Sequence, residues 1–232
     1  MDFVAAERNR IKAEYERRSK NIDPDLYAPW QPAEMLSHAA RIRSAATLLR
    51  RAQAFPRAGD QCLEIGFGAR GWLGDLITWG VRETDIHGIE LDPLKVERAR
   101  NILPASDLRV GDAAALPWPD NSFQLVIAST VFSSILDWRV RCLIASEVAR
   151  VIAPAGALLW YDSAYNNPRN SQVRKIDRGE LKQLFPGLRG QVRSITLAPP
   201  LARFIAPKSW PLAVLLETVP VLRTHLVAVL VK

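Results

Sequence analysis

Three glycines that follow a short apolar run constrain this chain more than any other feature. The run is 62–65, and Gly66, Gly68 and Gly71 come next, before residues that favour a helix. Glycine lets the backbone turn sharply and approach a ligand where a Cβ would collide with it. The stretch therefore predicts a buried strand, a tight turn and a helix N-terminus, which is how many α/β folds bind nucleotides.

Short runs of apolar or β-branched residues alternate with helix-like segments along most of the chain. This alternation predicts βαβ units and a mainly parallel sheet. At 232 residues the chain is long enough for one sizeable α/β domain with its own core. The expected strands are 61–67, 85–92, 107–116 with its exit loop, 123–130, 154–163 with a turn at its start, and 225–232. The expected helices are 3–20, 32–54, 71–80, 93–103 and 139–152.

Charge and cysteine usage narrow the function classes. The formal net charge of +7 suits nucleic acid, an anionic membrane surface or an acidic substrate. The basic residues are dispersed, and neither a zinc finger nor an aromatic RNA-binding motif accompanies them, so we do not expect nucleic acid. Cys62 and Cys142 lack metal-ligand spacing, and we expect two reduced core thiols, a cytoplasmic protein and no metal. The charged opening segment predicts no signal sequence.

A carboxylate follows the glycine turn at a distance that suits a nucleoside. Glu90 ends the second expected strand, where its side chain can accept hydrogen bonds from both hydroxyls of a ribose. NAD enzymes and S-adenosylmethionine (SAM) enzymes share this pairing of turn and acid. These residues alone do not distinguish an NAD site from a SAM site.

Four stretches in a fixed order narrow the choice. They are "LEIGFG" (63–68), "GIELD" (88–92), "GDAAALPWPDNSFQ" (111–124) and "SEVARVIAPAGALLWYD" (146–162). Their order and spacing resemble class I SAM-dependent methyltransferases of the type 11 group, over roughly residues 60 to 162. The resemblance implies a Rossmann-like, doubly wound α/β sheet, mostly parallel with an antiparallel last strand and with helices on both faces. It also implies SAM as cofactor and S-adenosylhomocysteine as product.

The resemblance also implies a role for each matching position. The glycines line the methionine part of SAM, Glu64 fixes the turn and the cofactor's amino group, and Glu90 binds the ribose. Aspartate after the third strand accepts from the adenine amino group, and the end of the fourth strand lies under the methionine tail. The implied cofactor-binding residues are Glu64, Gly66, Gly68, Gly71, Glu90, Leu91, Asp112, Ala113, Ala128 and Ser129.

Two loops are expected beside the transferred methyl group, because ligands of open α/β sheets lie beyond the carboxyl ends of the strands. They are 130–137 and 161–187. Asp162 is the first candidate for a general base, since it ends the fifth strand, and His225 is the second, for its intrinsic pKa. Asp137 is expected to cap the next helix. The candidate substrate-binding residues are Phe132, Ser133, Tyr165, Asn166, Asn167 and Arg169.

The chain is expected to divide into an N-terminal helical lid, 1–54, and a SAM-binding domain, 55–232. Tyr27 and Trp30 are candidate aromatics covering the cleft. The apolar segment 197–222 forms either the far wall of an acceptor pocket or a contact with a membrane surface; its charged residues argue against a transmembrane helix. We expect a monomer or a homodimer.

Several functions stay open. The first is methylation of a small molecule, on oxygen or else on nitrogen or carbon, with a sugar, lipid-linked glycan, quinone or natural product as substrate. The second is methylation of RNA or protein. The third is a non-catalytic binding module, because Phe67 and Arg70 depart from the family pattern within the turn. An NAD-dependent enzyme would leave "GDAAALP" unexplained.

Overall fold

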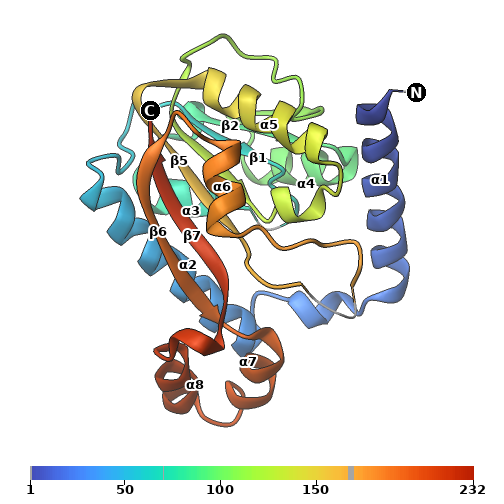
Figure 1. Cartoon of the computed structure of the whole chain (residues 1–232), viewed down its shortest axis with the longest axis vertical. Helices are drawn as coiled ribbons and strands as arrows, with labels where there is room; N and C mark the ends of the chain where they lie inside the picture. The colour runs from blue at the N-terminus through green and yellow to red at the C-terminus, as the bar shows by residue number, and fades with distance from the viewer. Residues whose placement is uncertain (1, 70, 167–169) are drawn as a thin grey trace.

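A seven-stranded sheet forms the centre of the molecule (Figure 1). The computed structural model describes residues 2–69, 71–166 and 170–232. The strand order is β3-β2-β1-β4-β5-β7-β6, and all neighbours pair in parallel except β7, which is antiparallel to β5 and β6. The expectation of a mostly parallel sheet with an antiparallel last strand is therefore confirmed.

The helices and strands follow the predicted alternation closely. Four of the described α-helices begin with an aspartate side chain that accepts from a backbone N–H of the first turn, and Asp137 does this for α5 as expected. The strands are β1 Cys62–Ile65, β2 Ile86–Glu90, β3 Asp107–Val110, β4 Phe123–Ser129, β5 Ile152–Ser163, β6 Arg189–Leu197 and β7 Arg223–Val231. The helices are α1 Phe3–Asn21, α2 Pro32–Arg51, α3 Leu73–Thr78, α4 Pro93–Ile102, α5 Trp138–Val151, α6 Arg178–Leu184, α7 Pro199–Ile205 and α8 Trp210–Glu217.

Helices cover both faces of the sheet, which explains why the central strands are apolar throughout (Figure 1). Successive residues of β1 and β4 alternate between two core clusters. Leu63 and Val126 face α1, α5 and α6, whereas Cys62 and Leu125 face α2, α3 and α4. Glu64 points to the same face as Cys62, because side chains alternate along a strand. The sheet thus places this acid on the α2–α3 side.

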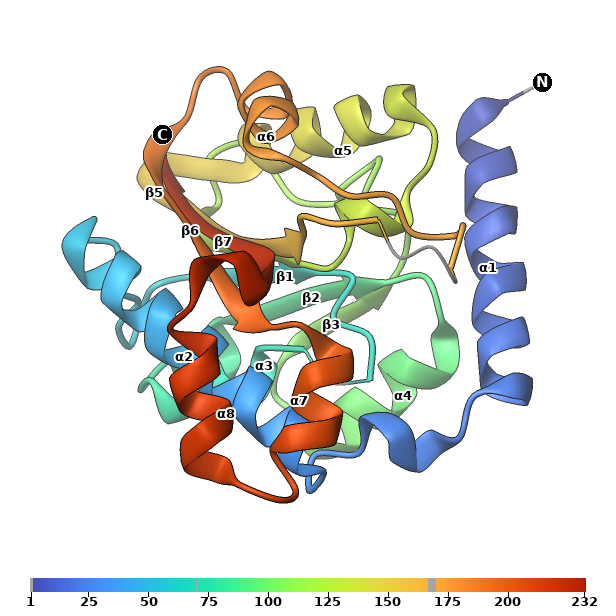
Figure 2. The same cartoon turned by 60° about the horizontal axis from the view of Figure 1, so that its bottom comes forward.

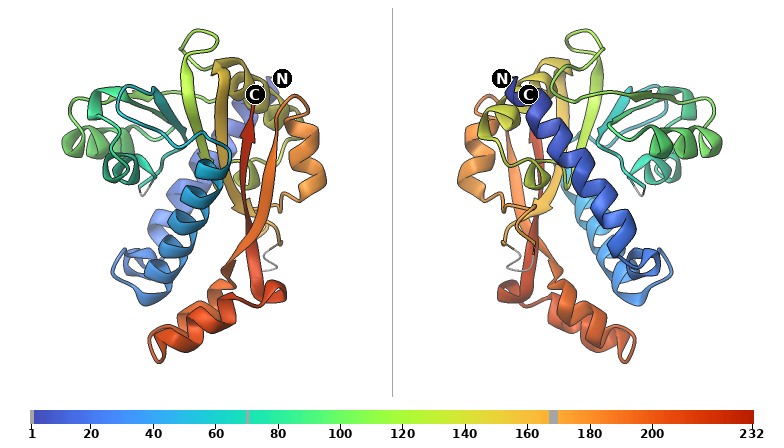
Figure 3. Two further views of the ribbon diagram at one scale, coloured as in Figure 1. Left: turned by 90° about the vertical axis from the view of Figure 1, so that its left-hand side faces the viewer. Right: turned by 90° about the vertical axis from the view of Figure 1, so that its right-hand side faces the viewer.

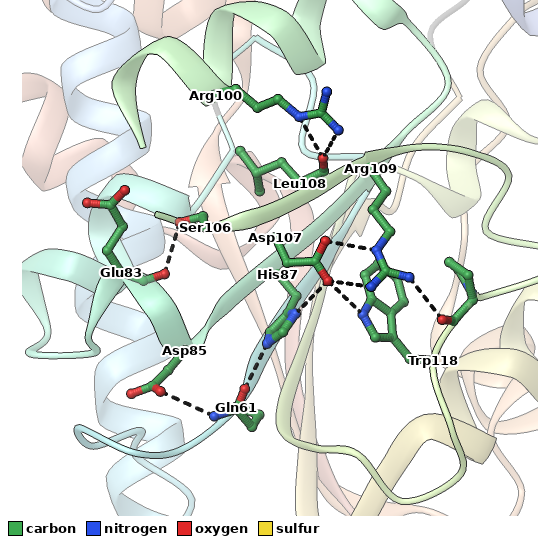
Figure 4. Close-up of polar contacts among 11 residues, drawn as sticks. Gln61, Glu83, Asp85, His87, Arg100, Ser106, Asp107, Leu108, Arg109 and Trp118 are labelled. Atoms are coloured by element: carbon green, nitrogen blue, oxygen red, sulfur yellow. Dashed lines mark hydrogen bonds and ion pairs between the residues drawn. The ribbon is translucent and has the colours of Figure 1, made fainter. Parts of the chain in front are cut away.

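The amino ends of β1, β2 and β3 are joined by a polar network (Figure 4). His87 lies between Asp107, at 3.3 Å, and the Gln61 side chain, at 2.7 Å. Arg109 donates two hydrogen bonds to Asp107, and the pKa of Asp107 falls to about 2, mainly through Arg109. The network lies at the edge opposite the carboxyl strand ends.

Three sequence expectations need correction. Residues 189–197 form β6, which was not predicted, because an edge strand with an exposed first half carries charged residues rather than an alternating pattern. Residues 178–184 form α6 within the expected loop 161–187. Cys142 is exposed, because the buried residues of α5 recur at Val140, Ile144 and Val148 and leave Cys142 on the outer face. Cys62 is buried as expected.

We expect opposite effects from two neighbouring substitutions in the irregular start of β5. Ala155 has a left-handed backbone, with φ of 60°, so Ala155→Gly should raise the free energy of unfolding by about 0.5–1 kcal/mol. A Cβ at Gly156 would lie 2.8 Å from the Phe123 carbonyl oxygen, so Gly156→Ala should lower it by about 1–3 kcal/mol. Thermal and denaturant unfolding measure both; a loss of stability in Ala155→Gly would contradict the first expectation.

Candidate active site

The glycine turn lies at the carboxyl end of β1, between the ends of β2 and β4. Gly66 and Gly68 have left-handed backbones, with φ of 62° and 57°, which explains the choice of glycine. The Gly66 N–H donates to the Ile89 carbonyl at 2.7 Å and so fixes the turn against β2. Among the described residues, a Cβ at Gly68 would have only the Gly66 carbonyl oxygen near it, at 4.0 Å. Gly68 is therefore the open side of the turn.

Gly71 makes room for an acid of the protein itself. A Cβ at this position would overlap the carboxylate of Glu64. That carboxylate is 1% exposed and accepts a hydrogen bond from the Trp72 N–H at 2.7 Å through Oε2. Its other oxygen, Oε1, has no hydrogen-bond partner among the described residues. A buried carboxylate oxygen in this condition favours a cationic or N–H-bearing ligand.

Burial raises the pKa of Glu64 to about 8, although the Trp72 N–H and the Arg41 charge act in the other direction. The carboxyl group is thus largely protonated at neutral pH. A cation bound beside Oε1 would stabilise the ionised form and release the proton. The site is consequently able to couple ligand binding to proton release.

Glu90 ties the end of β2 to the turn. One carboxylate oxygen accepts from the Gly68 N–H at 2.9 Å and the other from the Asp92 N–H at 3.1 Å. A carboxylate has about four lone-pair positions, so both oxygens can still accept further hydrogen bonds. Leu91 follows and is partly buried against the core.

The third motif lies on the neighbouring strand end. The Gly111 N–H donates to the Glu90 carbonyl at 3.0 Å, which brings Asp112 beside β2. One oxygen of Asp112 accepts from the Ala114 N–H at 2.9 Å, while Ala113 packs against the core. The structure thus gathers the first three sequence motifs at one edge of the sheet.

The loop after β4 is more buried than its expected substrate contact suggests. Ala128 is buried at the end of β4, and Ser129 is partly exposed. Phe132 and Ser133 are buried in a short 3₁₀ turn, and the Phe132 ring meets the Phe185 ring edge-on at 5.6 Å. The burial of these two side chains fixes the loop against the core.

Asp162 is the acid that holds this loop to β5. It is fully buried, and its carboxylate accepts from the Ser133 N–H at 3.0 Å and from the Ser163 N–H at 2.9 Å. Burial raises its pKa to about 6, although both hydrogen-bonding serines act to lower it. The group can therefore exchange a proton near neutral pH.

His225 lies on the other face of the sheet from Asp162. It pairs with Ser163 in the register of β5 and β7, and its ring stacks on Tyr161 at 5.0 Å and 4°. Tyr161 and Asp162 are consecutive residues of a strand and point to opposite faces. Burial and the Arg41 charge lower the pKa of His225 to about 4, so its ring is neutral at pH 7. The structure does not bring the two candidate bases together.

The expected substrate loop after β5 is only partly described. Tyr165 is exposed, and the Asn166 side chain accepts from the Lys175 N–H at 2.8 Å, which fixes a turn. Asn167 and Arg169 lie outside the described residues, as does Arg70 in the glycine turn. Phe67 is buried, with its ring against Gly88, so it does not fill the turn.

Two functional candidates escaped the sequence reasoning. Arg41 of α2 places its guanidinium over Trp72, at 5.5 Å, and over Tyr161, at 5.4 Å, which joins the Glu64 side to the His225 side. Tyr15 of α1 lies under the Lys95 ammonium at 3.5 Å, and the charges of Glu90 and Asp92 add to the burial that raises its pKa. From the sequence, Tyr15 was expected only on the apolar stripe of the helix 3–20, and no pattern indicated a role for Arg41.

Two absences hold within the described ranges. Residues 2–69, 71–166 and 170–232 contain no group of three or more histidine, cysteine or acidic side chains placed to bind a metal ion. No helix in this part of the chain combines the length and the apolar character needed to cross a bilayer.

Known proteins resemble this chain in sequence and in fold. A family model described as a methyltransferase domain matches residues 63–160. A "Probable S-adenosylmethionine-dependent methyltransferase" of Mycolicibacterium smegmatis is 30% identical over 55% of this chain and 51% of its own length. A 2-methyl-6-phytyl-1,4-hydroquinone methyltransferase of Synechocystis is 28% identical over 55% of this chain and 39% of its own. The matched part thus spans about half or less of these curated relatives.

Solved structures support the fold along nearly the whole chain. A chain from a Haloferax volcanii complex that contains the Trm112 methyltransferase activator superposes with a TM-score of 0.66. The match covers 97% of this chain and 96% of that one at 18% identity, a level that speaks for the fold alone. Together with the four motifs at the strand ends, these comparisons support the family expectation: residues 63–160 match a methyltransferase domain, and the chain resembles SAM-dependent methyltransferases in sequence.

Proposed function

We propose that this chain transfers a methyl group from SAM to an oxygen atom of a small-molecule acceptor, such as a sugar, a lipid-linked glycan or a natural product. The observation that carries the proposal is the buried Glu64 carboxylate beside the glycine turn, whose Oε1 has no hydrogen-bond partner among the described residues. SAM carries a sulfonium and an ammonium and has no phosphate. An acid, rather than a cradle of basic side chains, is what such a ligand requires.

Each part of the cofactor has a matching group at this edge. Glu64 would hold the ammonium, the open Gly68 would admit the methionine part, and Glu90 would accept from the ribose hydroxyls. Asp112 would accept from the adenine amino group, between Leu91 and Ala113. When bound, SAM supplies a methyl group bonded to a positively charged sulfur. Ala128 and Ser129 would lie beneath it.

Among these acceptors, we favour one with a hydrophobic part, such as a lipid-linked glycan or an apolar natural product. The Synechocystis relative is named for a prenylated hydroquinone, which supports this choice. Of the loops nearest the strand ends, the first contains a turn whose Phe132 and Ser133 are buried, and the second presents an exposed Tyr165. The Tyr165 ring offers an apolar face to such an acceptor.

We further propose Asp162 as the group that takes the acceptor's proton, because its pKa of about 6 lets it act as a base near neutral pH. Its two backbone N–H donors would keep it oriented. His225 is the weaker candidate, because a pKa of about 4 makes it a poor base.

The N-terminal segment 1–54 is proposed as a lid over the cleft. Glu7 accepts from the Leu136 N–H, and Arg10 donates to the Ser134 carbonyl and to the Gln172 side chain, so α1 holds both loops at once. Tyr15, one turn and more further along, reaches the end of β2 beside Lys95. In Figure 2, α1 runs past α5 toward α4, as these contacts require. Tyr15, rather than Trp30, is then the covering aromatic.

The first test is calorimetry with SAM, S-adenosylhomocysteine and NAD. We expect micromolar binding of the first two, no binding of NAD, and release of up to one proton per SAM at pH 7, because the ammonium ionises Glu64. Affinity should therefore rise as the pH approaches about 8. Glu64→Gln should bind more weakly and lose the proton release, measured in buffers of different ionisation enthalpy. Comparing the variant with the wild type cancels the ligand's own titration; the same proton count in both would contradict the proposed pose.

Asp162→Asn should leave the dissociation constant of SAM within about twofold and lower turnover by about 100-fold or more. In the wild type, kcat/KM should rise as the pH increases through about 6, because Asp162 must lose its proton to act as a base. The variant should lack this rise. If turnover survives with the same pH profile, Asp162 only positions the loop; if SAM affinity falls equally, Asp162 belongs to the cofactor site.

Two matched substitutions on α1 test the lid. Arg10→Ala removes the bonds to Ser134 and Gln172, so amide hydrogen exchange in α1 should become about tenfold faster, and SAM affinity should fall. Arg10 also forms an ion pair with Glu7, three residues before it. Arg17→Ala removes an ion pair of the same spacing, to Glu14, at an exposed position of the helix. It should change neither quantity. Equal behaviour of the two variants would show that α1 does not cover the site.

A further inference from the structure

The segment between β6 and β7 extends away from the rest of the molecule. It contains α7, α8 and the turn Pro220–Leu222, and Figure 3 shows the two helices beyond the end of the sheet. β6 ends and β7 begins at the edge where β1, β4 and β5 also end. The two helices therefore stand on the same edge of the sheet as the glycine turn.

The inner side of this segment is firmly attached. Ala202, Ala206 and Ala213 pack in one cluster with Ala33 and Leu36 of α2, beside which α7 lies in Figure 2. Small side chains allow the helices to approach closely.

Polar contacts fix the same segment at its base. Glu217 is buried and forms an ion pair with Arg43 of α2 at 3.1 Å. The Arg223 guanidinium donates to the Glu217 carbonyl at 2.7 Å and to the Thr218 carbonyl at 2.9 Å, where α8 ends. The two helices are thus held in a defined orientation.

The outer side of the segment is apolar. On α8, Ala213 and Glu217 are four residues apart and face the body, so Leu212 and Leu215 face outward, the latter 62% exposed. Val221, in the following turn, is 80% exposed. Such a concentration of exposed apolar side chains usually marks an interaction site. We call it the hairpin surface; it comprises Phe204, Trp210, Leu212, Leu215, Val219 and Val221.

Within the segment itself, the charges that remain at the surface are of one sign. The fully described stretch 198–222 has three charged residues: Arg203, Lys208 and Glu217. Glu217 is buried, so the acid does not contribute to the surface. Lys208 lies over the Phe204 ring at 3.5 Å, with its ammonium at the edge of the apolar patch. The surface therefore presents apolar side chains with a basic border.

Two occupants could cover such a surface: an anionic bilayer or a second copy of the chain. In a twofold dimer the same patch would face itself, and the interface would gather the cations of both borders with no surface acid of this segment to pair them. Like charges at an interface disfavour that arrangement. An anionic lipid surface instead attracts both cations, accepts aliphatic side chains among its acyl chains and suits tryptophan at the headgroup level.

We propose that the hairpin surface docks this protein onto an anionic membrane, with Leu215 and Val221 entering the acyl region and Lys208 and Arg203 at the headgroups. Docking in this orientation turns the carboxyl edge of the sheet toward the bilayer. Membrane binding is a property of the surface alone and does not require methyl transfer. It can therefore hold or fail independently of the function proposed above.

Vesicle co-sedimentation of the full chain tests the proposal. The probes are vesicles of phosphatidylcholine alone and vesicles that also contain phosphatidylglycerol. We expect binding to the anionic vesicles that weakens with salt and is much lower with neutral vesicles. The double variant Leu215→Ser/Val221→Ser should bind at least about tenfold more weakly, because two exposed apolar side chains no longer enter the bilayer. Lys208→Glu should weaken binding to anionic vesicles only.

Matched controls lie elsewhere on the surface. Ile102→Ser changes a side chain that is 76% exposed on α4, and Lys182→Glu reverses an exposed charge on α6; both should bind vesicles like the wild type. Circular dichroism checks that each variant folds. Failure of the wild type to bind anionic vesicles, or equal binding by the double variant, would overturn the proposal. A dimer in light scattering that the double variant dissociates, without vesicle binding, would assign the surface to a second copy instead.

Discussion

One hydrogen bond, from the Trp72 N–H to the buried Glu64 carboxylate, determines much of the site's geometry. It joins the end of β1 to the start of α3 across the glycine turn. Because the carboxylate fills the space beside residue 71, only glycine fits there. The same hydrogen bond holds the Trp72 backbone close to β1, and the Trp72 ring is part of the core on the α2–α3 face. A single acid thus fixes the turn and the start of α3.

Most of the fold could be predicted because its central strands are buried on both faces and alternate with helices of clear periodicity. The edge strand β6 could not, because its first half is exposed and Arg189, Gln191 and Arg193 give no alternation of apolar residues. The prediction that Cys142 is buried was wrong for a related reason. Its neighbours in sequence are apolar, but the orientation of α5 places its thiol on the outer face. Local composition does not reveal which side of an element meets the core.

Some residues of the site could be placed from the sequence, and others could not. Residues set by strand ends, such as Glu64 and Glu90, converge as the motifs indicate, because parallel strands bring their carboxyl ends to one edge. Residues whose role depends on the face of a strand were not foreseeable. Asp162 and His225 lie at the same edge, yet the pleat directs them to opposite sides. The contact of Arg41 with two aromatic rings depends on how α2 packs, which sequence spacing does not encode.

The way in which α1 is attached affects the rate at which ligands can enter and leave the proposed site. Glu7 and Ile11 are the buried residues of this nineteen-residue helix. Phe3, Val4 and Tyr15 are partly buried against the core. The attachment of α1 therefore rests on a few polar contacts and on less apolar area than the continuous core of the sheet beside it. Local opening of α1 should cost far less free energy than global unfolding and recur on a much shorter timescale. Under the proposed lid role, the frequency of that opening would set the upper limit on product release, independently of the chemical step.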